Sequence, residues 1–84
     1  MKEGIEAYRD FRYSDSLKML DRYLRDTQAP LHGRVEALVY GGASAWMLGD
    51  EGRARAFFQN VRSLDPWYRI DPDEFDPDIM GCFP

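Results

Sequence analysis

Residues 37–66 read ALVYGGASAWMLGDEGRARAFFQNVRSLDP, and this stretch decides the fold. Apolar side chains recur in it at steps of three and four residues, which is the period of an α-helix. The pattern breaks at Gly49-Asp50 and stops at Asp65-Pro66, because the residue before a proline avoids helical torsions. Two helices over about residues 30–48 and 50–64 are therefore predicted, joined by a tight turn, with Asp50 as the N-cap of the second.

A weaker copy of the same pattern lies 38 residues earlier. The matching positions are Gly4, Ala7, Ser16, Leu20 and Tyr23 against Gly42, Ala45, Ala54, Phe58 and Val61. This copy predicts two more amphipathic helices, over about residues 2–11 and 14–26, with Ser14 as the N-cap of the second. The linker between the copies falls at residues 27–33.

The spacing within the copies resembles a tetratricopeptide repeat. Leu38, Gly42, Ala54, Phe58 and Pro66 stand in the slots of that signature, and Leu48-Gly49-Asp50 matches its favoured turn. Gly41 and Ala45 depart from it, since Leu and an aromatic residue are usual there, although Trp46 is adjacent. The resemblance implies an all-α fold of two antiparallel helical hairpins, at about residues 2–26 and 30–64. These would form an α-solenoid fragment within a domain of residues 1–66.

The last segment, residues 67–84, has a different character and reads WYRIDPDEFDPDIMGCFP. Its three prolines exclude a long helix, and Asp71-Pro72 and Asp76-Pro77 each predict a cap followed by one helical turn. It is similar to tails that follow the last repeat in some bacterial proteins of this family. A solenoid needs its terminal helix covered, so a non-regular capping tail is predicted. The residues expected to pack on the fourth helix are Trp67, Tyr68, Ile70, Phe75 and Ile79.

Charge and composition restrict the classes of partner. The net charge of −4 divides into +1 over residues 1–64 and −5 over residues 65–84, so the acidic tail disfavours nucleic acid. No apolar run approaches the roughly 18 residues of a membrane span, so no membrane insertion is expected. We expect a soluble chain. It would be cytoplasmic, or periplasmic and envelope-associated if excised from a longer bacterial protein.

The residues that carry chemistry are too dispersed for an enzyme. His32 lies in the predicted linker and Cys82 in the tail, whereas catalysis needs a nucleophile, a base and an orienting group together. No paired cysteines have zinc-site spacing. The acidic run from Asp71 to Asp78 lacks the central Gly and distal Glu of a calcium loop. No catalytic residue, metal or cofactor is therefore expected.

The resemblance suggests a binding function instead. In stacked hairpins the first helix of each pair lines the concave surface, which here would carry Tyr8, Arg9, Val39, Tyr40, Ala43, Trp46 and Met47. The leading interpretation is a protein–protein interaction adaptor that binds a peptide or protein segment through this apolar, aromatic face. Val39 and Ala43 suit the core equally well. The alternative is a structural or oligomerisation unit of a larger, cell-envelope assembly, in which copies of the chain meet as a homo-oligomer.

Overall fold

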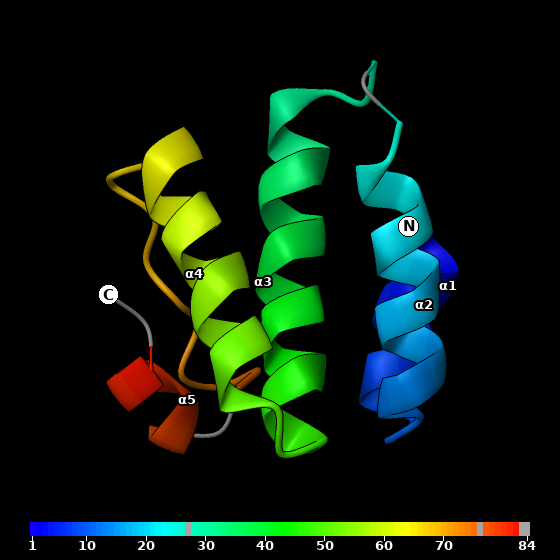
Figure 1. The fold of residues 1–84 in the computed structure, drawn as a ribbon, viewed down its shortest axis with the longest axis vertical. Coiled ribbons are helices and arrows are strands. Elements are labelled where there is room, and N and C mark those ends of the chain that lie inside the picture. Colours follow the sequence, from blue (N-terminus) through cyan, green and yellow to red (C-terminus); the bar gives the residue numbers. More distant parts are fainter. Residues whose placement is uncertain (27, 76, 83–84) are drawn as a thin grey trace.

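The structure, a computed structural model, describes residues 1–26, 28–75 and 77–82, without the side chains of residues 80 and 82. The helices are α1 (Lys2–Arg9), α2 (Tyr13–Leu24), α3 (Leu31–Met47), α4 (Glu51–Leu64) and α5 (Pro77–Cys82). The described residues include no strand, which confirms the predicted all-α class. Figure 1 shows α3 standing between α2 and α4, with α1 beside α2 and α5 beside the lower part of α4.

Helix α3 forms the centre of the core. It packs against α1, α2 and α4, and it is buried on several sides, as its broad apolar stripe predicts. Its buried positions are mostly small: Gly33, Val35, Ala37, Leu38, Val39, Gly41, Gly42, Ala43, Ser44 and Ala45. Small side chains allow neighbouring helices to approach closely on each side.

The same glycine contact occurs twice, 38 residues apart. A methyl group on Gly42 would lie 2.5 Å from Phe58 Cε1, and one on Gly4 would lie 2.7 Å from Leu20 Cδ2. Phe58 and Leu20 are both fully buried. Each glycine thus admits the large side chain of the following helix, which explains why the two copies keep a glycine at this position.

The two interhelical turns are also alike. The N–H of Asp50 donates to the Ala45 carbonyl at 2.9 Å, and the N–H of Arg12 donates to the Ala7 carbonyl at 2.8 Å. Both turns place one residue in the left-handed region, Gly49 at φ 85° and Phe11 at φ 62°. This pattern closes a helix C-terminus, and glycine is its preferred residue. Phe11 holds the strained position despite its Cβ, at a cost of about 1–2 kcal/mol.

One predicted helix cap is present and the other is wrong. Asp50 Oδ1 accepts a hydrogen bond from the Arg53 N–H at 3.1 Å, which confirms the predicted cap of α4. Ser14 is not an N-cap, because α2 already begins at Tyr13 and Arg12 occupies the cap position. The turn at Phe11 returns the chain to helical torsions earlier than the sequence suggests.

A chain of two buried hydroxyl groups connects three helices. Ser16 Oγ donates to the Gly4 carbonyl at 2.7 Å, and Ser44 Oγ donates to Ser16 Oγ at 3.1 Å. Both serines are fully buried, so these bonds satisfy polar groups that would otherwise be costly in the core. This pairing could not be predicted from local sequence patterns, because the serines are 28 residues apart.

The tail leaves α4 at Asp65 and is anchored by Arg62, whose guanidinium donates to the carbonyls of Pro66 and Tyr68. It ends in the helix α5, which packs on α4. Helix α5 begins at Pro77, where the sequence predicts a helical turn, within a tail that is otherwise expected to be non-regular. The expected cap at Asp76 and the apolar residue Phe83 lie outside the described residues.

Trp67 does not pack on α4 as predicted, since 89% of its surface is exposed. The reason is the turn that ends the helix. Asp65 accepts hydrogen bonds from the Trp67 N–H at 3.2 Å and, through its carbonyl, from the Tyr68 N–H at 3.1 Å. Of these neighbours only Tyr68 packs against the core, and Ile70 does so further along. Phe75 and Ile79 are buried.

Candidate protein-binding face

Side chains from α1, α2 and α3 meet on one side of the molecule, which we call the α1/α3 face: Tyr8, Arg9, Tyr13, Tyr40 and Met47. The Tyr8 ring lies 5.5 Å from that of Tyr40 and 5.6 Å from that of Tyr13, both edge to face. This is a favourable geometry for aromatic pairs.

The tail lies on this face, not on the flank of α4 alone as the sequence analysis predicted. The ring of Phe75 is 5.1 Å from that of Tyr40 and 5.6 Å from that of Tyr8, measured between centroids. Only 5% of Phe75 is exposed. The aromatic surface expected to receive a partner is thus partly covered by an aromatic residue of the same chain.

An ion pair accompanies the aromatic contact. Arg9 Nε and an Arg9 terminal nitrogen donate to the two carboxylate oxygens of Glu74, each at 3.1 Å. The same terminal nitrogen donates to the Tyr40 hydroxyl at 3.4 Å. The bond to Glu74 is the main reason that the pKa of Arg9 is raised above its ordinary value, and the charge of Glu74 adds to the shift. A two-point arginine–carboxylate contact fixes orientation as well as charge. Arg9 therefore holds the residue that precedes Phe75.

The residues expected on the concave surface separate into two groups. Tyr8, Arg9, Tyr40 and Met47 lie at the α1/α3 face. Val39 and Ala43 are fully buried and belong to the core, the role that the sequence left equally open. Trp46 is half-buried and packs against the core cluster.

Sequence reasoning missed the residues that complete this face. Glu74 and Phe75 come from the tail, Phe11 from the turn between α1 and α2, and Tyr13 from the start of α2. The sequence does place an acidic residue directly before an aromatic one in the tail, and a single arginine in α1, which together could have suggested an ion pair. Residues 65 positions apart in sequence could not be paired from it.

Beside the bound tail the face remains open. A cavity of about 340 Å³ is lined by Tyr8, Arg9, Phe11, Tyr13, Met47 and Glu74. Phe11 is 78% exposed and Met47 is 40% exposed. The strained backbone at Phe11 holds its ring next to Tyr13, with centroids 6.2 Å apart. Three of the six residues that line this cavity are aromatic.

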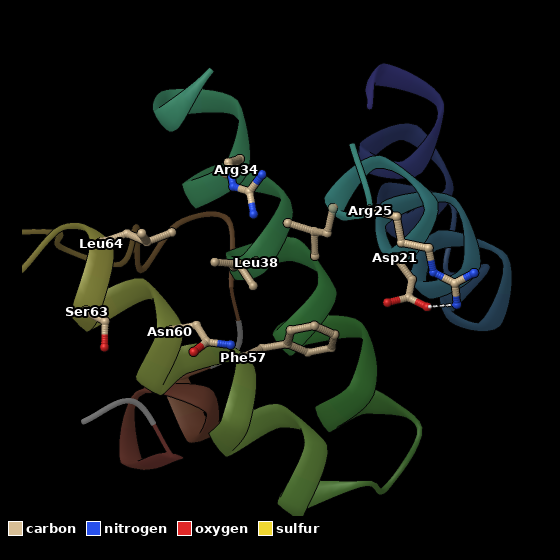
Figure 2. Close-up of a pocket in the computed structure, with 9 residues that line it drawn as sticks. Asp21, Arg25, Arg34, Leu38, Phe57, Asn60, Ser63 and Leu64 are labelled. Atoms are coloured by element: carbon tan, nitrogen blue, oxygen red, sulfur yellow. Dashed lines mark hydrogen bonds and ion pairs between the residues drawn. The ribbon is translucent and has the colours of Figure 1, made fainter. Parts of the chain in front are cut away.

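A second cavity, of about 430 Å³, is lined by residues of α2, α3 and α4. Figure 2 shows the side chains that line it. Leu38 and Phe57 give it an apolar floor. Its charged residues are already engaged: Asp21 pairs with Arg25 at 3.3 Å, and Arg34 donates to the Asp26 carbonyl at 3.1 Å. No segment of the described chain indicates an occupant for this cavity, so the α1/α3 face is the stronger candidate.

Two tyrosines, Tyr40 in α3 and Tyr68 in the tail, make stability sensitive to high pH. Burial raises the pKa of Tyr40 and of Tyr68 above the ordinary value of 10.0, and nearby carboxylates add to the shift. A pKa raised on folding contributes stability that is full below the unfolded-state value and is lost as the pH rises through the folded-state value. We expect stability to fall from about pH 10 upward. The Tyr40→Phe and Tyr68→Phe chains should lose less of their free energy of unfolding than the wild type between about pH 9 and pH 11, as measured by urea unfolding. An equal loss in the wild type and both variants would contradict this.

The histidine and cysteine side chains singled out as chemical candidates in the sequence lie apart from the α1/α3 face or outside the described part of the structure. His32 lies 3.4 Å from Glu36 on α3, and the Cys82 side chain lies outside the described residues. The described residues contain no group of three or more His, Cys, Asp or Glu able to hold a metal ion, and no helix among them has the length and apolar character to cross a membrane. Comparison of the chain with protein-family models, curated proteins and solved structures finds no match.

Proposed function

We propose that this chain is a protein-interaction adaptor that binds a peptide or protein segment through its α1/α3 face, on two tetratricopeptide-like hairpins. The observation that carries the proposal is that this face already receives a short turn of the chain's own tail, with Glu74 on Arg9 and Phe75 against Tyr8 and Tyr40. Aromatic rings and an arginine fork supply the contacts. Buried aromatic residues and arginines dominate protein interfaces, and both are present here.

The alternative, a structural or oligomerisation unit, rests on a different surface. Leu31, Leu64 and Trp67 are exposed near the start of α3 and the end of α4, at 57%, 39% and 89%. Such side chains could meet those of another copy. The two functions use different parts of the molecule and can be separated by experiment.

The test is site-specific photo-cross-linking in an extract of the source cells. A benzophenone amino acid replaces Met47 at the rim of the face or, as the control, the exposed Gln59 on α4. We expect a discrete adduct from position 47, none from position 59, and loss of the adduct when Arg9→Glu is added. Equal adducts at both positions would contradict the adaptor function, and an adduct of twice the chain mass would favour the oligomeric unit.

A further inference from the structure

The tail segment on the α1/α3 face has a defined local structure. The N–H groups of Glu74 and Phe75 both donate to the Asp71 carbonyl at 3.2 Å, and Asp71 Oδ1 accepts from the Asp73 N–H at 2.9 Å. Asp71 thus caps a single helical turn that begins with Pro72, as the sequence predicts for this position. The turn places the Glu74 carboxylate and the Phe75 ring next to each other.

The face complements both groups of this turn. Arg9 binds the carboxylate at two points, and the rings of Tyr8 and Tyr40 contact the Phe75 ring. Glu74 retains 23% of its side-chain exposure and Arg9 retains 56%, so the ion pair is accessible to water. Water screens the two charges, so the pair contributes less to stability than the same contact would in the core.

We propose that residues 71–75 occupy the binding site of the partner and resemble the segment that the partner inserts there. The partner of the adaptor function proposed above, on which this inference rests, would be a protein carrying an acidic, proline-initiated turn in which a carboxylate directly precedes an aromatic residue. Such a turn would replace Glu74 on Arg9, and its aromatic ring would take the place of Phe75 against Tyr8 and Tyr40. The chain's own turn therefore competes with the partner and lowers its apparent affinity.

Exchange of the chain's own turn for that of the partner changes the free energy little, because the partner's carboxylate and aromatic ring make the same contacts that Glu74 and Phe75 made. The incoming aromatic side chain fills the space that Phe75 leaves, so no cavity remains on the face. The advantage of the tail is its tether, which gives it an effective concentration of about millimolar order. A partner with additional contacts can exceed this advantage by using the adjacent cavity at Phe11, Tyr13 and Met47.

The experiment uses the full chain and a fluorescein-labelled peptide with the sequence of residues 70–80, IDPDEFDPDIM. Glu74→Arg turns the attraction to Arg9 into repulsion, loosens the internal turn and leaves Arg9 free for the peptide. Asp73→Arg is the matched control, because it makes the same charge change at an exposed neighbour that lies outside the Arg9 contact. Circular dichroism verifies that each chain keeps its helical content.

Fluorescence anisotropy should show that Glu74→Arg binds the peptide about five- to tenfold more tightly than Asp73→Arg and the wild type. A peptide with alanine in place of Phe75 should not bind. As a second comparison, the Arg9→Glu chain should prefer a peptide with lysine in place of Glu74, whereas the wild type prefers the original sequence.

Equal binding by Glu74→Arg and Asp73→Arg, or undiminished binding of the alanine peptide, would overturn the inference. So would a wild-type dimer in light scattering that the peptide dissociates, since the tail would then be exchanged between copies. If the peptide fails while the cross-link from position 47 persists, the partner is recognised by other chemistry and the adaptor function stands. If the peptide behaves as expected without that cross-link, the adaptor function fails instead.

Discussion

Replacing Phe75 with alanine is expected to lower the free energy of unfolding by about 3–5 kcal/mol, as truncation of a core phenylalanine does. Phe75 lies in the tail, where a short sequence segment would ordinarily contribute little. The loss is expected because only 5% of its surface is exposed and its ring contacts those of Tyr8 and Tyr40. For a domain of this size such a loss is a large part of the total stability.

Trp67→Ala is the matched control for that experiment. It also removes a large aromatic side chain from the tail, but this side chain is 89% exposed, so the change should stay within about 0.5 kcal/mol. Urea unfolding followed by circular dichroism measures both variants. Similar losses from the two substitutions would contradict the tail path described above.

The second large effect concerns two adjacent glycines in α3. We expect alanine to lower the free energy of unfolding at one of them and to raise it at the other. Gly42→Ala places a methyl group 2.5 Å from Phe58 Cε1, and we expect a loss of about 1–3 kcal/mol from overpacking. Gly41→Ala places its methyl group 3.7 Å from the Phe57 ring, an ordinary contact. There the better helix propensity of alanine should raise stability by about 0.5–1 kcal/mol.

The two alanine variants differ only in position, so the difference between them isolates the close approach of α3 and α4. Thermal or urea unfolding of the pair is sufficient. A gain from both substitutions would show that Phe58 adjusts without cost. A loss from both would show that Gly41 is also needed for packing.

The four long helices could be predicted from the sequence because their signals are local. Helical periodicity and the stop at Asp65-Pro66 depend on neighbouring residues, and so do the Gly49 turn and the Asp50 cap. The same reasoning failed at Ser14, where the turn at Phe11 determines the start of α2. A phenylalanine in the left-handed region has no local sequence signal.

The path of the tail could be predicted only in part. Its apolar content indicated packing, and Asp71-Pro72 indicated a capped turn, both from local patterns. Its destination depends on Arg9 and Tyr40, which are 65 and 34 residues away from Glu74. Several surfaces of the helical domain could have received an acidic, aromatic segment, and the choice between them is made by three-dimensional packing. The serine pair in the core was missed for the same reason.

The most direct test of the central claim, that the chain's own tail occupies the α1/α3 face, is a nuclear Overhauser measurement between aromatic rings in the full-length wild type. With the ring of Phe75 centred 5.1 Å from Tyr40 and 5.6 Å from Tyr8, cross-peaks from Phe75 ring protons to both tyrosines are expected. The Phe75 protons should also be shifted by the neighbouring rings. Phe75 ring protons at random-coil chemical shifts, without cross-peaks to either tyrosine, would contradict the claim that the tail occupies this face.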